Sequence, residues 1–168
     1  YTVAEISSFQ LETVHRFHPV VSAILNITPD HLNRHHTMEC YAHTKERIAE
    51  NQTKDDVCVL NMEDEELYRF GSECKASVVW FSSKRKPDKG AYLDGDDIRY
   101  TDGTQDKLML NIHDMNLLGT HNYENVCAAI AMTKAVGIPD DIIIEQVKCF
   151  KAVEHRIEYV ATKKGVWY

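Results

Sequence analysis

The stretch Val20-Val-Ser-Ala-Ile-Leu-Asn-Ile27, followed by Thr28-Pro-Asp-His-Leu-Asn-Arg-His35, decides the fold class of this chain. Residues 20–27 form an apolar run, which is typical of a strand buried on both faces, as in a parallel sheet. The run ends abruptly in polar residues. Because ligands of open α/β sheets bind just beyond the carboxyl ends of the strands, we expect an α/β fold with a ligand site at residues 28–35.

The next segment predicts a helix that carries a lysine on its inward face. Thr37 is a favourable N-cap residue for this helix. Lys45 shares the register of the apolar stripe that follows, which consists of Met38, Tyr41, Ala42, Ile48 and Ala49. A lysine at such a position usually extends its amine to the surface. The alternative is that the amine is needed inside a site, next to the loop that carries His31, and the pattern leaves both interpretations open.

Composition argues against several classes of protein. The chain has 168 residues, enough for one full-sized domain, and its 43% hydrophobic content is typical of soluble globular proteins. No apolar run approaches the roughly 18 residues that a membrane helix needs, and no signal-peptide pattern is present. The net charge of −7, without a basic patch, argues against a nucleic-acid-binding protein.

The five cysteines indicate a reducing compartment. They are odd in number, far apart and without C-x-x-C spacing. Cys58, Cys127 and Cys149 lie in apolar stretches, so we expect these three thiols to be buried. This pattern predicts a cytoplasmic protein.

Strand and helix patterns alternate along the rest of the chain. We expect strands at 1–6, 57–61 and 76–81, and helices at 63–70, 121–136 and 140–150. Three short segments predict an antiparallel meander at the edge of a parallel sheet, at 91–93, 98–101 and 107–112. The inward stripe of the helix at 121–136 is expected to consist of Val126, Ala129, Ile130 and Thr133.

Both ends of the chain have the pattern of interrupted elements, since apolar strand sequence starts at residue 1 and stops at residue 168. We therefore expect a piece of a longer protein. The polar segment 151–156 predicts a connection between domains, and residues 157–160 and 166–168 predict a hairpin. We accordingly expect one domain at 1–152 and the beginning of a second at 153–168.

Three positions near the expected strand ends are candidates for chemistry. Glu5 ends the first expected strand, where its carboxylate suits magnesium, which prefers oxygen ligands; the alternative is a solvated glutamate. Ser7 and Ser8 are either a helix cap or donors to an anionic ligand. His31 is a candidate contact for a ligand or for bound magnesium.

A histidine cluster that binds zinc is the non-enzymatic alternative for this region. His31, His35 and His36 are close in sequence, but no glutamate completes an H-E-x-x-H pattern and no cysteine lies at ligand spacing. Pro29 and Thr37 indicate a loop between them rather than a helix. The sequence therefore argues against a zinc site.

Two asparagines and one arginine are candidates for nucleotide binding. Asn122 and Asn125 lie three apart in the first turn of their expected helix, so both amides can point the same way. An amide offers the donor and the acceptor that the edge of an adenine requires, whereas the alternative is helix capping. Arg156 can reach a phosphate from a neighbouring domain, or it is a surface arginine.

Five motifs follow one another in a distinctive order. They are Glu5-Ile-Ser-Ser-Phe-Gln-Leu-Glu12, the residues 24–35, Lys45, Gly119-Thr-His-Asn-Tyr-Glu-Asn125 and His155-Arg-Ile-Glu158. In this order the chain resembles the Mur ligases, ATP-dependent amide-forming enzymes of peptidoglycan precursor synthesis. The resemblance spans nearly the whole chain. It implies most of a central ATPase domain of P-loop type, with a mostly parallel sheet, flanking helices and a truncated N-terminal side.

The resemblance also implies cofactors and roles. Two magnesium ions are implied: Glu5 would bind the one that bridges the ATP phosphates, and His31 would help hold the second. Lys45 would carry a carbamate, which is an oxygen donor suited to a hard cation. ATP would be bound by Asn122, Asn125 and Arg156. The uridine-linked substrate would contact Ser7. His31 and Lys45 would thus serve the reaction, in which ATP converts a carboxylate into an acyl phosphate that an amine then attacks.

The choice of substrate depends on one motif. The Ser-Ser-Phe-Gln-Leu-Glu stretch is most similar to Mur ligases that join D-glutamate to UDP-N-acetylmuramoyl-L-alanine. The alternatives are a sister Mur ligase that adds another amino acid and folylpolyglutamate synthase, which shares the domain. We further expect a monomer that does not insert into membranes.

The chain departs from the family pattern in two ways. Asn33 replaces the second aspartate of the family's Asp-His-Leu-Asp-Arg, which puts a salt bridge to a nearby cation such as Arg34 in doubt. A glycine-rich phosphate loop is also missing from the sequence. Because of the missing loop, we expect the chain to be inactive alone. Without a second magnesium ion to hold a carbamate in place, we expect its Lys45 to be a bare amine.

Overall fold

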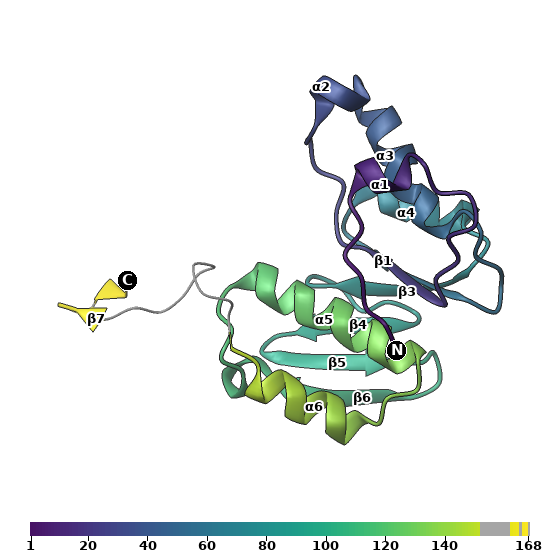
Figure 1. Cartoon of the computed structure of the whole chain (residues 1–168). Helices are drawn as coiled ribbons and strands as arrows, with labels where there is room; N and C mark the ends of the chain where they lie inside the picture. Colours follow the sequence, from purple (N-terminus) through teal and green to yellow (C-terminus); the bar gives the residue numbers. More distant parts are fainter. Residues whose placement is uncertain (152–161, 165, 168) are drawn as a thin grey trace.

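The computed structural model describes residues 1–151, 162–164 and 166–167. It contains a six-stranded sheet in the order β1-β2-β3-β4-β5-β6 (Figure 1). The strands are β1 Val21–Ile24, β2 Val57–Asn61, β3 Ser77–Ser82, β4 Gly90–Asp94, β5 Asp97–Thr101 and β6 Asp106–Asn111. Strands β1 to β4 are parallel, and β4, β5 and β6 form an antiparallel meander. The expected α/β fold class is confirmed.

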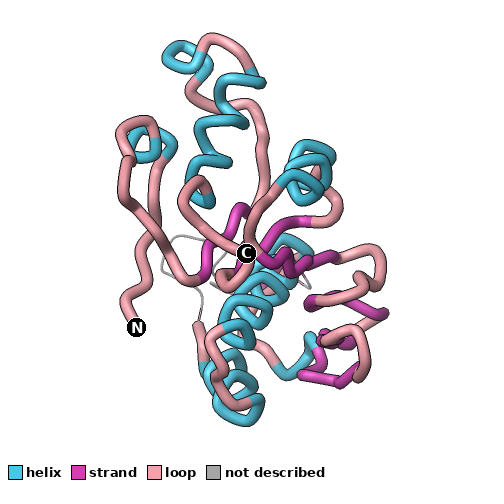
Figure 2. The backbone as a smooth tube through the Cα atoms, turned by 90° about the vertical axis from the view of Figure 1, so that its right-hand side faces the viewer, coloured by secondary structure: helices cyan, strands magenta, loops and turns pink. Residues whose placement is uncertain are grey.

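Helices cover the sheet on both faces (Figure 2). One group comprises α3 Met38–Glu46, its 3-10 extension η1 Arg47–Ala49 and α4 Glu65–Glu73. The other comprises α5 Thr120–Ala135 and α6 Asp140–Cys149. Three shorter elements are α1 Ser8–Leu11, α2 Leu32–His35 and η2 Ile112–Asp114. Except at residues 1–6, the predicted alternation of strands and helices is confirmed, with small shifts at the ends of the elements.

Strand β2 shows why an apolar run forms a central strand here. Successive side chains of a strand point to opposite faces. Val59 is fully buried in the core beneath α5, together with Ile130. Cys58 and Leu60 are fully buried in the opposite core, together with Leu67 of α4. Both faces of the sheet are therefore covered, as a parallel sheet requires.

The connection between β3 and β4 is unusually short. Parallel strands usually need a crossover of a dozen or more residues, whereas only residues 83–89 link these two. Gly90 lies opposite Trp80 and has a φ of 144°. A Cβ on Gly90 would lie 1.8 Å from the Trp80 carbonyl oxygen. This close approach requires a glycine.

The expectation of a strand at residues 1–6 was wrong. The segment is extended but unpaired, and the side chains of Tyr1 and Val3 are exposed. A strand exists only where a neighbouring strand accepts its backbone hydrogen bonds. In the described part of the chain, no backbone hydrogen bond joins residues 1–6 to β1 or to any other strand.

Three finer expectations were also wrong. The first strand is shorter than 20–27 and ends at Ile24. Cys58 and Cys127 are buried, but Cys149 is exposed because it ends α6, of which only Ile143 is buried. On α5, Val126 and Ile130 are buried as expected, whereas Ala129 and Thr133 are only partly buried because they face α6 rather than the sheet.

At the C-terminal end, β7 Thr162–Lys163 pairs with β8 Val166–Trp167 in an antiparallel hairpin. Its turn falls at Lys164. The expected strand at 157–160 lies outside the described residues, as does most of the expected connection, so the division at residue 152 stays a prediction. None of the helices in the described part of the chain combines the length and apolar character needed to cross a bilayer.

Candidate functional site

The loop after β1 is fixed by polar side chains that follow β2. Asn61, the last residue of β2, donates through Nδ2 to the Leu25 carbonyl oxygen at 3.1 Å. The Asp64 carboxylate accepts a hydrogen bond from the Ile27 amide at 2.7 Å. The chain therefore leaves β1 along a defined path at the carboxyl edge of the sheet, where a ligand site was expected.

Lys45 lies against this loop. Its Nζ donates to the Asn26 carbonyl oxygen at 2.9 Å and lies 5.2 Å from the centre of the Tyr41 ring. The residue is partly buried, on a helix whose N-cap is Thr37, as predicted. This position favours the interpretation in which the amine belongs to the loop region. What the amine does there stays a prediction.

Residues 28–37, which we call the His31 turn, contain a short helix where only a loop was expected. The helix α2 is flanked by His31 and His36, whose φ angles are 53° and 67°. Such left-handed backbone is disfavoured for residues other than glycine, so other contacts must hold it. The His31 side chain is 47% exposed, and its Nε2 lies 3.3 Å from the Asp30 carboxylate.

Ser7 caps the helix that leads into this region. Its Oγ accepts a hydrogen bond from the Gln10 amide, and the Gln10 side chain accepts one from the Ser7 amide at 2.8 Å. This reciprocal pair is a capping box, so the helix-cap interpretation of Ser7 is confirmed. A substrate contact of Ser7 stays a prediction.

Three side chains around α1 contact the His31 turn. Ser8 Oγ and His35 Nε2 are 3.0 Å apart and buried. The Phe9 ring lies 4.7 Å from the His31 ring, centre to centre. Glu12 binds the Arg34 guanidinium through two nitrogens, at 2.9 and 2.6 Å. The sequence motif contained these residues, but the pairing across more than twenty positions is visible only in the fold.

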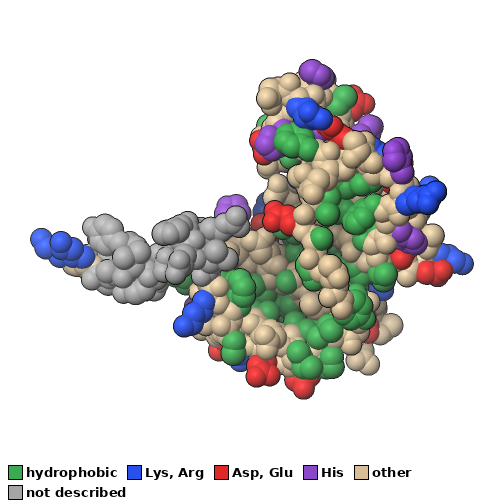
Figure 3. Space-filling view, in the orientation of Figure 1, with side chains coloured by type: hydrophobic (Ala, Val, Ile, Leu, Met, Phe, Trp, Pro, Cys, Tyr) green, Lys and Arg blue, Asp and Glu red, His purple; other side chains and the backbone are tan. Residues whose placement is uncertain are grey.

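The Glu12–Arg34 pair also answers the question raised by Asn33. The hydrogen bond from Arg34 holds the pKa of the Glu12 carboxyl below its ordinary value, and that of Arg34 is raised in return. Arg34 thus has a carboxylate partner although the family aspartate is absent. Figure 3 shows histidine and basic side chains gathered at the end of the molecule formed by α1 and α2.

The predicted magnesium ligands are only partly brought together. Lys45 contacts the loop after β1 at Asn26, which precedes the His31 turn, whereas Glu5 is exposed and forms no hydrogen bond or ion pair with other described residues. Within the described ranges, no group of three or more His, Cys, Asp or Glu side chains is arranged to hold a metal ion. This contradicts the histidine-cluster alternative.

Asn122 and Asn125 line one groove between α5 and α6, which has a volume of about 490 Å³. We call it the α5–α6 groove. Asn122 donates through Nδ2 to the Leu118 carbonyl oxygen at 2.7 Å, so this amide holds the turn before α5. Asn125 is exposed. Most of the remaining wall is apolar and includes Val126, Ile138, Ile142, Ile143, Val147 and Phe150.

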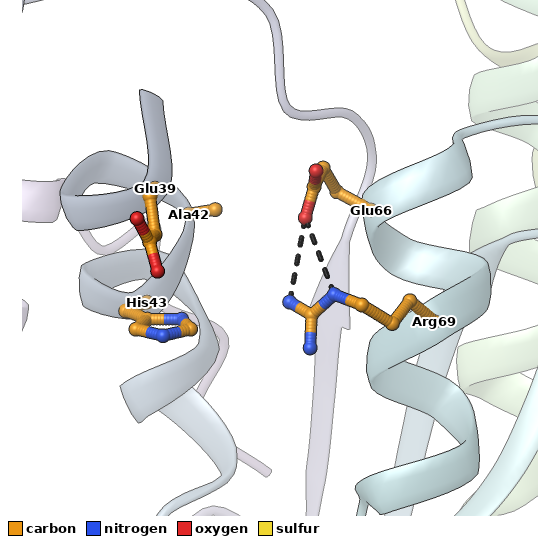
Figure 4. A pocket seen from close by; sticks show the side chains of 5 residues that line it. All are labelled: Glu39, Ala42, His43, Glu66 and Arg69. Carbon is orange, nitrogen blue, oxygen red and sulfur yellow. Dashed lines mark hydrogen bonds and ion pairs between the residues drawn. The ribbon is translucent and has the colours of Figure 1, made fainter. Parts of the chain in front are cut away.

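A second hollow, of about 480 Å³, lies between α3 and α4 (Figure 4). Arg69 on its wall binds Glu46 at 2.8 Å, Glu66 at 3.3 Å and Glu73 at 3.1 Å. The Glu46–Arg69 pair joins α3 to α4. This network connects two helices and contains none of the predicted site residues. Arg156, the remaining candidate, lies outside the described residues.

The family model and the relatives that match this chain agree on one protein family. The Mur ligase middle domain matches residues 1–133. The UDP-N-acetylmuramoylalanine–D-glutamate ligase of Lachnospira eligens is 82% identical over 168 residues, and that of Clostridioides difficile is 47% identical over 167. These alignments cover 100% and 99% of this chain but 37% of each relative. The chain thus spans little more than a third of these relatives.

Solved structures share the fold at low identity. MurF from Acinetobacter baumannii has a TM-score of 0.65 at 17% identity, over 87% of this chain and 32% of that one. A point mutant of L. casei FPGS has a TM-score of 0.58 at 17% identity, over 86% of this chain and 37% of that one. At such identities the likeness concerns the fold alone.

Proposed function

Because this chain belongs to the Mur ligase family, as a Mur ligase middle domain, we propose that it is part of a longer ligase that adds D-glutamate to UDP-N-acetylmuramoyl-L-alanine. The observation that carries this proposal is the 82% identity over all 168 residues to a ligase named for that reaction. A sister ligase or folylpolyglutamate synthase is supported only by likeness of fold.

The proposed reaction has two steps. ATP transfers its terminal phosphoryl group to the carboxylate of UDP-N-acetylmuramoyl-L-alanine, which gives an acyl phosphate and ADP. The amine of D-glutamate then attacks the acyl carbon, the amide bond forms, and inorganic phosphate leaves. The ligase acts by holding these groups in line and by stabilising the charge that develops on the phosphoryl oxygens.

One magnesium ion would be held by Glu5, and a second by His31 and a carbamate on Lys45. Magnesium is usually bound by one or two protein ligands together with substrate phosphates, so a partial set of protein ligands fits this ion. The half-exposed His31 side chain, and the Lys45 amine bound to the Asn26 carbonyl oxygen of the loop that leads to His31, support this assignment. When bound, magnesium supplies positive charge that neutralises the transferring phosphoryl group.

ATP would bind through Asn125 and Asn122 at the α5–α6 groove, with Arg156 contacting the nucleotide. The apolar wall of the groove suits the face of a flat base, and the exposed Asn125 offers both a donor and an acceptor to its edge. Ser7 would contact the uridine-linked substrate, since α1 lies next to the His31 turn. D-Glutamate would be bound mainly by parts of the ligase beyond this chain.

The setting of the ligase follows from the same proposal. We place it in the cytoplasm, because the five cysteines of the chain are all free thiols. We also propose that the ligase is a monomer. Light scattering from the purified full-length ligase measures its mass directly, and a dimer mass would contradict this point.

Phosphate release by the full-length ligase tests the proposed function. The ligase is supplied with ATP, magnesium and UDP-N-acetylmuramoyl-L-alanine, and then with D-glutamate, L-glutamate or a diamino acid. Release that depends on D-glutamate alone is expected. Release with another amino acid would move the chain to a sister reaction, and no release with this nucleotide substrate would contradict the proposal.

A chimera makes the test specific to this chain. The matching segment of the Lachnospira eligens ligase is replaced by these 168 residues, which differ from it at about one position in five. If the chain is the middle domain of the same enzyme, the chimera keeps its D-glutamate-dependent phosphate release. A chimera that folds but releases no phosphate would contradict the proposed function.

A further inference from the structure

The His31 turn is not stable through its own backbone. Its helix α2 has four residues, and both flanking histidines have left-handed φ angles. An isolated helix of this length is unfavourable, and each left-handed residue adds strain. The position of His31 must therefore be set by contacts from outside the turn.

These contacts come from the neighbourhood of α1, which lies beside α3 and below α2 in Figure 1. One aromatic ring, Phe9, contacts three residues of the turn. It lies 4.7 Å from the His31 ring, 5.8 Å from the His35 ring and 5.2 Å from the Arg34 guanidinium carbon. On the buried side of the turn, a hydrogen bond joins the Ser8 and His35 side chains. We call Ser8, Phe9, Glu12, Arg34 and His35 the α1–α2 brace.

The brace is anchored to the helix that carries Lys45. Arg47, two residues beyond Lys45, donates to the Glu12 carbonyl oxygen at 2.6 Å and to the Val14 carbonyl oxygen at 2.7 Å. Glu12 therefore has two attachments, through its backbone to Arg47 and through its carboxylate to Arg34. This sequence of contacts connects the elements that carry His31 and Lys45.

We infer that Glu12 and Arg34 are positioning residues, which fix His31 relative to Lys45 for the phosphoryl-transfer step. The inference rests on the proposed function, because that function assigns His31 and Lys45 to the reacting end of ATP. Neither Glu12 nor Arg34 is assigned a contact with ATP or substrate. They act through the turn, and a displacement of about 1 Å at a reacting group can lower a rate on the order of 100-fold.

Because Arg34 is exposed, the effect of an Arg34 variant on the position of His31 can be distinguished from an effect on the stability of the fold. Its side chain is 56% exposed, and an ion pair at such a position contributes little to the free energy of unfolding. A large loss of rate in an Arg34 variant that folds normally therefore reports on the position of His31. Arg85 is a matched control, because it is 52% exposed, pairs with Glu63 and stacks on Tyr68 away from the turn.

The experiment compares Arg34→Ala and Arg85→Ala in the full-length ligase. For Arg34→Ala we expect kcat to fall about tenfold, within the range that small displacements produce, with the KM for ATP changed less than about twofold. Hydrogen exchange, measured without ATP or magnesium, should show faster exchange for amides at 28–37 in Arg34→Ala and not in Arg85→Ala. Glu12→Gln serves as the second variant if Arg34→Ala does not fold.

A charge swap provides the rescue. The double variant Glu12→Arg with Arg34→Glu restores an ion pair at the same place, and we expect it to recover more than half of the lost kcat on a logarithmic scale. Unchanged kcat in Arg34→Ala, or equal losses in Arg34→Ala and Arg85→Ala, would overturn the inference. A wild-type ligase without D-glutamate-dependent phosphate release would instead contradict the proposed function.

Discussion

The His31 turn and the α5–α6 groove are both candidate ligand regions, but the molecule builds them differently. The turn is held by ion pairs and hydrogen bonds between side chains that are far apart in sequence. The groove results from the packing of two regular helices, and its wall is mostly apolar (Figure 3). Polar placement suits residues that must act on phosphoryl oxygens, whereas an apolar groove suits a base that only needs to be bound.

The largest expected effect concerns ATP turnover, because neither region contains a loop that binds the phosphates of ATP. The 168-residue chain contains no glycine-rich loop that could hold the phosphates of ATP. We expect the isolated chain to show no ATP turnover above a buffer blank, measured as phosphate release with magnesium present. The full-length ligase is the positive control. Turnover by the isolated chain would mean that the His31 turn and the α5–α6 groove are sufficient for ATP hydrolysis without a phosphate-binding loop. It would contradict the different roles proposed for these two regions.

Lys45→Ala in the full-length ligase should have the next largest effect. If Lys45 serves the phosphoryl-transfer step, its loss should lower kcat by about 100-fold to 1,000-fold, as for other groups that stabilise a transition state. The exposed Lys75, which lies outside both regions, provides the control Lys75→Ala, and its kcat should stay within about twofold of wild type. A Lys45→Ala variant with kcat within tenfold of wild type would show that the turn region does not carry the chemistry.

We expect variants of the two asparagines of the groove to differ: one should mainly weaken ATP binding and the other should mainly lower the stability of the fold. Asn125→Ala should raise the KM for ATP about tenfold with little change in kcat, because one hydrogen bond of about 1.4 kcal/mol is lost on binding. Asn122→Ala removes the bond to the Leu118 carbonyl and should lower the free energy of unfolding by about 1 kcal/mol. Steady-state kinetics and urea unfolding of both variants measure these effects. A larger KM change in Asn122→Ala than in Asn125→Ala would show that Asn122, and not Asn125, makes the main contact with ATP.

The groove was the more predictable of the two regions. Helix periodicity defined α5 to within one residue at each end, and a spacing of three placed Asn122 and Asn125 on one side of it. Helix periodicity predicts which residues share one face of a helix, but not which element packs against that face. The prediction for Ala129 and Thr133 was therefore wrong, because these two residues face α6 instead of the sheet.

The turn was predictable in its residues but not in its contacts. The motifs identified Ser7, His31 and Lys45, and the end of the apolar run 20–27 placed His31 at the sheet edge. Nothing local in the sequence indicated that Arg34 pairs with Glu12, or that His31 and His36 have left-handed backbone. Residues 1–6 failed as a strand for the same reason, since pairing depends on a partner that local pattern does not supply.

The smallest expected effect concerns the ion pairs that hold α6 beside the groove. Asp140, in the first turn of α6, accepts hydrogen bonds from Lys107 of β6 and from Lys134 of α5. These two lysines hold the pKa of the Asp140 carboxyl below its ordinary value of 3.8. Because the folded-state pKa is lowered, the stabilisation is fully present above 3.8 and is lost as the pH falls through the folded-state pKa.

Asp140→Asn should therefore lower the free energy of unfolding by about 1 kcal/mol or less at neutral pH. The difference from wild type should shrink toward zero as the pH falls below 3.8, measured by urea unfolding in the full-length ligase. Asp141→Asn is the control, since Asp141 is exposed in the same helical turn and forms no ion pair among the described residues. A difference that is the same at all pH values, or equal in both variants, would show that the α6 terminus and not the lysine pairs stabilises the groove. The groove would then depend on helix packing alone, which would sharpen its contrast with the polar His31 turn.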